Sequence, residues 1–108
     1  MRPVRWLGSS LADLRAFPEG ARTRAGYELM RVQLGDDPTG WKPLSTVGPG
    51  VHEIRVRIDT THRVSYLGTR NETVYVLHAF EKRTVRTPKR DIDLASSRLR
   101  VLSAEREE

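Results

Sequence analysis

The stretch Val51–Ile58, VHEIRVRI, alternates between apolar and polar side chains, and this period of two constrains the fold more than any other feature. In an extended strand its alternate side chains point to opposite faces. Each face collects three residues: Ile54, Val56 and Ile58 on the apolar face, and Glu53, Arg55 and Arg57 on the charged face. The apolar face has to be covered by another layer, so the chain needs a sheet packed against helices or against a second sheet.

Two further segments are predicted to be strands of the same sheet. In RVSYL, residues 63–67, Val64 and Tyr66 share one face and Arg63 lies on the other. TVYVLHAF, residues 73–80, is apolar on both faces, which favours a central or well-covered strand. Turns are predicted at DTTH and GTRNE. Strict alternation would place His78 on one face with Val74, Val76 and Phe80.

Helical spacing of apolar residues predicts three helices. The first runs from Ser10 to Ala16, with Ser10 as its cap and Asp13 three residues later. The second begins around Pro18 and ends at Gly35, and its buried stripe is Ala21, Ala25, Leu29 and Val32. The last follows Thr87 and Pro88 with the stripe Ile92, Ala95, Leu99 and Leu102, and the tail SAEREE is expected to fray.

The resulting prediction is a single domain, residues 1–108, of the α+β class. It has an N-terminal helical hairpin, an antiparallel sheet of three or more strands and a C-terminal helix. The chain has no cysteine, no apolar run long enough to cross a bilayer and no apolar signal core after its first residues. We therefore expect a cytoplasmic protein with no membrane partner.

Positive charge is concentrated in the second half of the chain. The whole chain has a net charge of +5, while residues 51–100 carry eleven Lys or Arg and six Asp or Glu. The densest part is HAFEKRTVRTPKRD, residues 78–91, where a predicted strand meets the last helix. A localised positive field points to a polyanion, with nucleic acid first, an acidic protein second and a membrane surface third.

The sequence with these features resembles the RelE/ParE superfamily of bacterial type II toxins, and within it the HigB-like, phage-related branch. The resemblance covers nearly the whole chain. It rests on VRWLGSSLADLRAFP, WKPLSTVGPGVHEIRVRI, HRVSYL and, most specifically, VYVLHAFEKRTVRTP. It implies the α+β fold predicted above, a cognate antitoxin encoded adjacently, usually of the helix-turn-helix type, and ribosome-dependent cleavage of mRNA.

The resemblance also implies roles for particular residues. In RelE-like toxins, basic residues on the first long strand, after the following turn and at the end of the last strand contact and cleave mRNA. The matching positions here are Arg55, Arg63, Lys82 and Arg83. Some relatives use a C-terminal tyrosine or an acidic and histidine cluster near the scissile bond, but this chain has neither after Tyr75 and His78, and Lys89 stands in roughly that region. The residues that transfer protons therefore stay open.

The chemical requirements of RNA cleavage, considered without the resemblance, select a similar set of residues. Cleavage of RNA without a metal needs a base for the 2′-hydroxyl, positive charge on the phosphoryl oxygens and an acid for the leaving oxygen. Arginine suits the charge role, because it stays protonated and binds phosphate with two donors. Glu53 or His78 could be the base, and Lys82 or Lys89 the acid. Further RNA contacts are predicted for four residues: Arg57, Arg86, Lys89 and Arg90.

Several of these signals have a purely structural alternative. Arg55 and Arg57 could form a solvated face that blunts sheet association. His78 could be a satisfied core histidine, and Glu53 could simply pair with an arginine. Trp41 could stack on a base or could pack a loop. The three histidines lack the spacing of metal ligands, so neither a metal nor another cofactor is expected.

Three functions remain open from sequence. The first is a metal-independent endoribonuclease that binds the ribosome, cleaves mRNA and so inhibits translation. The second is a ParE-like inhibitor of DNA gyrase, because the same fold supports both activities. The third is a phage-derived RNA-binding or protein-binding module without catalysis.

Overall fold

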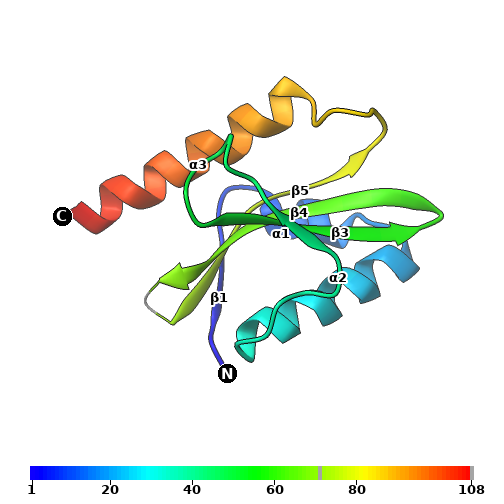
Figure 1. Cartoon of the computed structure of the whole chain (residues 1–108), viewed down its shortest axis with the longest axis horizontal. Helices are drawn as coiled ribbons and strands as arrows, with labels where there is room; N and C mark the ends of the chain where they lie inside the picture. Colours follow the sequence, from blue (N-terminus) through cyan, green and yellow to red (C-terminus); the bar gives the residue numbers. More distant parts are fainter. Residues whose placement is uncertain (71, 108) are drawn as a thin grey trace.

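The computed structural model describes residues 1–70 and 72–107, and it has a mixed sheet between two helical layers. Figure 1 shows the elements in chain order. They are β1 (Val4–Trp6), α1 (Ser10–Arg15), α2 (Glu19–Gln33), β2 (Trp41–Pro43), β3 (Val51–Ile58), β4 (Thr60–Arg70), β5 (Thr73–Lys82) and α3 (Lys89–Glu107). Within the described residues no helix is long and apolar enough to cross a membrane.

The strands lie in the order β1-β5-β4-β3-β2. The three long strands are antiparallel neighbours, as the alternating pattern predicts, and β2 also pairs antiparallel with β3. β1 pairs parallel with β5, over Val74 to Val76 only. The α+β class is therefore confirmed, while β1, β2 and the parallel pairing were not predicted.

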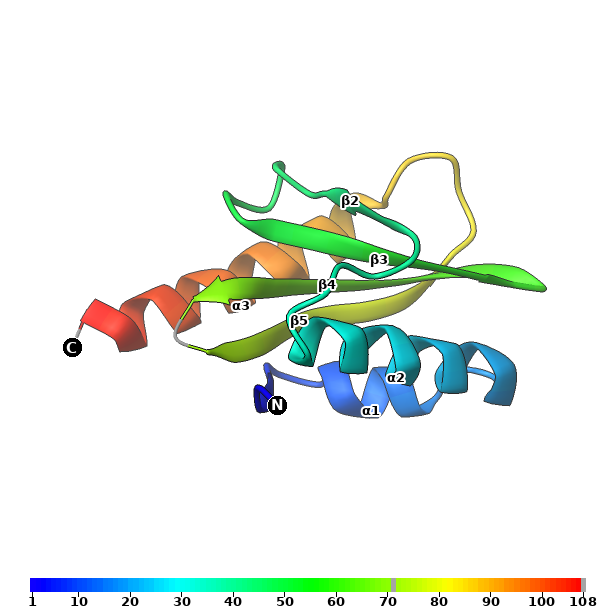
Figure 2. The same ribbon diagram turned by 60° about the horizontal axis from the view of Figure 1, so that its bottom comes forward.

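Helices cover both faces of the sheet, with α1 and α2 on one side and α3 on the other (Figure 2). The first core lies beneath α1 and α2, and its fully buried members include Ala25, Ile54, Val64, Val74 and Val76. The second core lies beneath α3. It contains Leu7, Leu44, Val51, Leu67, Tyr75, Leu77, Ala95 and Leu102. The predicted stripes of α2 and α3 are the residues that pack into these cores.

A bulge in β5 overturns the expected arrangement of its side chains. Tyr66 lies opposite Val76, but the preceding Ser65 lies opposite His78, so Leu77 is an extra residue. Val76 consequently belongs to the core beneath α1 and α2, whereas Leu77 and His78 lie on the α3 side. His78 therefore does not share a face with Val74 and Val76, because strict alternation fails at the bulge.

The ends of several elements also differ from expectation. Ser9, not Ser10, is the N-cap of α1, and its hydroxyl donates to the Asp13 carboxylate and makes no capping hydrogen bond. The buried Ser10 hydroxyl donates to the carbonyl of Val76. Pro18 is the N-cap of α2 rather than part of its first turn. Only Asp59, at φ 62°, separates β3 from β4. Ile58, beside this hairpin end, is 37% exposed.

The remaining differences concern the last two boundaries. β4 continues to Arg70, and the turn expected over GTRNE falls partly on Asn71, which lies outside the described residues. The tail is helical to Glu107, so the fraying expected of SAEREE is wrong for the residues that the structure describes. An ion pair of 2.7 Å from Arg5 to Glu105 attaches this last part of α3 to β1.

Candidate nucleic-acid interface

The face of the sheet that α3 covers carries cations where the apolar core ends. We call this area the basic face, and it consists of Lys42 from β2, Arg55 and Arg57 from β3, Arg63 from β4 and Lys82 from β5, around Glu53. The pairing register assembles it, because Lys42 lies opposite Glu53, and Arg55 lies opposite Arg63. Side chains directly opposite on antiparallel strands lie close together.

Glu53 is the anion at the centre of the basic face. Its side chain is fully buried, and Oε1 lies 3.2 Å from an Arg63 guanidinium nitrogen and 3.8 Å from Lys42 Nζ. Its other oxygen, Oε2, has no hydrogen-bond partner among the described residues. Arg63 is itself only 5% exposed. Of the two interpretations of Glu53, the pairing with an arginine is thus present in the structure.

The surroundings of Arg63 and Lys82 show that positive charge is crowded here. Burial lowers the pKa of the Arg63 guanidinium; Glu53 opposes this effect, whereas Arg55 and Arg57 add to it. Burial also lowers the pKa of Lys82, and the positive charge of Arg63 lowers it further. Arginine stays protonated at neutral pH even so. Lys82 is therefore the group on this face whose proton is made easier to lose.

Unsatisfied donors remain on the basic face. Nε of Arg55 and Nε of Arg63 are buried and have no hydrogen-bond partner among the described residues. Buried polar atoms are normally paired, so such exceptions call for an explanation. An anion that accepts from the arginine side chains would provide one.

The structure does not bring Arg83 into contact with the Glu53–Arg63 pair. Arg83 follows the end of β5, its side chain is 84% exposed, and it donates to Glu81. Glu81 also accepts from the hydroxyl of Thr60 and lies 3.8 Å from His62. Lys82 and Arg83, which the sequence treats as one basic pair, thus diverge in the structure.

The other predicted RNA contacts lie along the segment that leads into α3. Arg86 is exposed in the connection between β5 and α3. Lys89 forms a 2.8 Å ion pair with Asp93, which raises the pKa of Lys89. Arg90 is exposed and lines a groove along the edge of β5 that is described below. The structure therefore spreads these three side chains over the connection and the start of α3.

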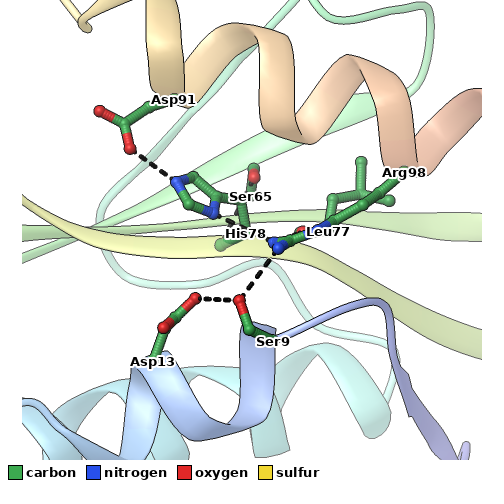
Figure 3. Close-up of polar contacts among 7 residues, drawn as sticks. All are labelled: Ser9, Asp13, Ser65, Leu77, His78, Asp91 and Arg98. Carbon is green, nitrogen blue, oxygen red and sulfur yellow. Dashed lines mark hydrogen bonds and ion pairs between the residues drawn. The ribbon is translucent and has the colours of Figure 1, made fainter.

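His78 lies between β5 and α3 in a separate polar network (Figure 3). Its Nε2 is 2.7 Å from Asp91, and Arg98 donates to its Nδ1 at 3.2 Å. Arg98 also donates to the carbonyl of Leu77 and to the Ser9 hydroxyl, which in turn donates to Asp13. Because arginine has no acceptor, Nδ1 of His78 is the acceptor and Nε2 carries the proton.

This network lines a groove of about 770 Å³ along the edge of β5 that β1 leaves uncovered. Phe17, Phe80 and Leu94 contribute its apolar lining, and Arg83 and Arg90 also line it. Gly8, at φ 54°, lies directly beneath Arg98, and a Cβ at Gly8 would stand 2.4 Å from Arg98 Nε. His78 is 5% exposed, so the structure places it as a satisfied histidine apart from the basic face.

Lys42 is the member of the basic face that sequence reasoning missed. It lies on a three-residue strand inside a segment rich in Gly, Pro and Thr, where no periodicity assigns a face. Only the pairing of β2 with β3 brings it to Glu53. Within the described residues no three His, Asp or Glu side chains come together as a metal site.

The fold and the basic face can now be compared with known families. Residues 12–100 match the model of the family described as phage derived protein Gp49-like. The chain belongs to the Gp49-like family. This family is part of the RelE/ParE-like toxin superfamily, so the coarser part of the resemblance seen in the sequence is confirmed. No curated protein sequence matches the chain.

The family match spans every element of this Gp49-like protein that contributes to the basic face. It begins within α1 and ends within α3, so it includes β2, β3, β4 and β5. The basic face therefore lies within the part of the chain that matches the family.

Proposed function

We propose that this Gp49-like protein is the toxin of a type II toxin–antitoxin system of the HigB-like branch. It cleaves mRNA on the ribosome, acts in the cytoplasm and is neutralised by an antitoxin, usually of the helix-turn-helix type, encoded beside it. The observation that carries the proposal is the basic face, where three arginines and two lysines from four strands surround one buried glutamate.

The side chains suit cleavage by the 2′-hydroxyl of the RNA. This oxygen gives its proton to solvent and attacks the neighbouring phosphorus, the bond from phosphorus to the 5′ oxygen of the next nucleotide breaks, and a 2′,3′-cyclic phosphate remains. Arg55 and Arg63 stabilise the charge that develops on the phosphoryl oxygens. Lys82 donates its proton to the leaving 5′ oxygen, which its lowered pKa favours.

The role of Glu53 follows from its burial. It is fully buried, and its Oε1 lies beside Arg63 and Lys42, so it holds the Arg63 guanidinium in place rather than facing the RNA directly. His78 is held by Asp91 and Arg98 beneath α3 and takes no part in the reaction. The ribosome contributes to the positioning of the 2′-hydroxyl.

The test is expression in bacteria, with the 5′ ends of cellular mRNA mapped after induction. We expect new 5′ ends within translated messages, together with growth arrest. The variant Arg55→Ala should lose both effects, because it removes a charge directed at the phosphate. The matched control is Arg15→Ala, an exposed arginine at the end of α1, which should behave like the unmodified protein.

Two outcomes would overturn the proposal. Growth arrest with intact messages would exclude mRNA cleavage, and a supercoiling assay with purified gyrase would then test the gyrase inhibitor. Harmless expression of a folded protein would indicate a module without toxicity.

A further inference from the structure

A groove of about 600 Å³ lies along the outer edge of β3 and shares Arg55 and Arg57 with the basic face already described. β2 pairs with β3 only from His52 to Ile54, and the carbonyl of Gly40 then accepts from the amide of Arg55. Beyond this point the groove runs between the end of β3 and α2. Its volume is within the range of small-molecule binding sites. We call it the β3-edge groove.

Three arginines from two elements line the β3-edge groove. They are Arg24 from α2 and Arg55 and Arg57 from β3. The side chain of Arg24 is 44% exposed, Arg57 is exposed, and Nε of Arg55 is buried without a hydrogen-bond partner among the described residues. The groove therefore gathers three guanidinium groups that can donate to an anion.

The carboxylate that lines the β3-edge groove is already bound by protein groups and does not face a ligand. Glu28 is buried, and its two carboxylate oxygens accept from the amide and the hydroxyl of Thr39. It also lies 3.7 Å from Arg24. Glu28 thus fixes the segment that precedes β2, and the arginines leave the groove with an excess of positive charge.

An aromatic ring completes the lining. Trp41 is half-buried at the start of β2, and its ring lies 4.4 Å from that of His52, tilted by 31°. His52 in turn contacts Tyr66 edge-on, so the indole belongs to a packed aromatic cluster. Aromatic rings beside a positive groove bind single-stranded nucleic acid, because bases stack on the ring while phosphates contact the cations.

We propose that the β3-edge groove binds one nucleotide of single-stranded RNA, adjacent to the nucleotide whose phosphate lies on the basic face. The base stacks on Trp41, and its phosphate contacts Arg24 and Arg57. Arg55 connects the two sites, since it lines the groove and lies opposite Arg63 on the basic face. The strand thus passes around the edge of β3.

The chemistry of the groove favours a nucleotide over an acidic protein segment. A carboxylate would satisfy the arginines, but it would make no use of the part of the indole that lines the groove. A nucleotide satisfies both, and the planar guanidinium group matches a phosphate with two donors. The inference rests on the proposed function only for the identity of the RNA as message, since binding in the groove requires no cleavage.

The first experiment uses the two tryptophans of the chain as separate reporters. Trp6→Phe retains only Trp41, and Trp41→Phe retains only Trp6, which packs against the core beneath α1 and α2. Each is titrated with a 2′-O-methyl hexanucleotide, which lacks the attacking hydroxyl. We expect the fluorescence of Trp6→Phe to be quenched and that of Trp41→Phe to stay unchanged.

The second experiment compares two arginines of α2 in the same binding assay. Arg24→Ala should weaken binding of the hexanucleotide by about fivefold or more, on the scale of one lost nucleotide contact. Arg22→Ala, also exposed but outside the groove, should bind like the unmodified protein. Melting temperatures of all variants show whether each one is folded.

The results separate this inference from the proposed function. Unchanged Trp41 fluorescence at saturating hexanucleotide would contradict the proposed nucleotide site in the groove. Equal affinities of Arg24→Ala and Arg22→Ala would contradict it as well. Displacement of the hexanucleotide by polyglutamate at lower concentration than by polyuridine would overturn it in favour of an acidic partner. If Trp41 is quenched but the protein cleaves no message, the proposed nucleotide site is supported and the proposed cleavage of mRNA is contradicted.

Discussion

Glu53 and Arg63 form the buried ion pair on which the basic face depends. Neither side chain reaches solvent appreciably, and each is placed by a different strand. Taking two charges out of water is costly, and the cost is offset only while both partners are present. Their arrangement therefore couples the stability of the sheet to the geometry of the proposed active site.

Glu53→Ala should lower the free energy of unfolding by about 3–5 kcal/mol, because it leaves the Arg63 guanidinium buried without its carboxylate. Urea denaturation measures the loss. Asp36→Ala, an exposed acidic residue after α2, is the control and should change stability by no more than about 0.5 kcal/mol. Equal effects of the two substitutions would contradict a structural role for the ion pair.

Lys82 permits a test by pH, because burial and Arg63 lower its pKa below the ordinary lysine value of 10.5. An acid has to be protonated, so the single-turnover cleavage rate should fall as the pH rises through this lowered pKa. Lys82→Arg keeps the charge but cannot release the proton, so its rate should be about a hundredfold lower and should show no such alkaline fall. The measurement uses programmed ribosomes at saturating toxin.

If Lys82→Arg retains the full rate, or shows the same alkaline fall, another group donates the proton. Melting temperatures across the same pH range would show whether either protein unfolds during the assay.

At the scale of elements, α3 divides the second face of the sheet into a covered part and an open part. Its stripe packs on Leu67, Tyr75 and Leu77, while the basic face lies where that core ends. His78 and Arg98 attach the helix to β5, and Arg98 also reaches Ser9 beside α1. The placement of α3 thus determines which cations stay accessible.

Leu102→Ala should destabilise the protein by about 2–5 kcal/mol, because Leu102 is 1% exposed within the core beneath α3. Its neighbour Val101 is 53% exposed, so Val101→Ala should cost no more than about 0.5 kcal/mol. Chemical denaturation of both variants gives the comparison. A similar cost for the two would mean that the C-terminal half of α3 does not pack as described.

The parts that could be predicted are those in which periodicity leaves no choice. The alternation in VHEIRVRI assigns Arg55 and Arg57 to the face opposite Ile54, and the stripe of α3 identifies Ala95 and Leu102. β1 and β2 have three residues each, too few to show a period. In β5 both faces are apolar, so the pattern gives no sign of a bulge.

The candidate site was predictable to the same extent. Glu53, Arg55 and Arg63 were expected together, and the register confirms that they lie on adjacent strands of one face. The separation of His78 from this group depends on the bulge and on contacts from α3, which lie far away in sequence. The divergence of Lys82 and Arg83 follows from their adjacency at the end of β5, and only the bond from Arg83 to Glu81 has no signal in the sequence.

At the scale of the whole molecule, the excess positive charge lies mainly on the second half of the chain, which contributes most of the basic face. A polyanion bound there releases the counterions associated with its phosphates. Affinity should therefore depend on salt in proportion to the number of phosphates contacted.

If the basic face and its flanking residues engage about four phosphates of a single strand, the logarithm of affinity should fall with the logarithm of salt concentration at a slope near −3. Anisotropy of a labelled RNA in increasing sodium chloride measures this slope. Arg57→Ala should reduce its magnitude by about 0.7, because one phosphate contact is lost. A slope near zero would mean that RNA binds elsewhere or by uncharged contacts.

The bulge at Leu77, and not only the identity of the side chains, decides which charges reach this surface. If the same residues alternated strictly from Val76 onward, without the bulge, every later side chain of β5 would lie in the opposite layer. Lys82 would then lie away from the other cations, and Glu81 would take its place. One extra residue in the strand thus sets the electrostatic sign at the end of β5 while the amino-acid composition stays the same.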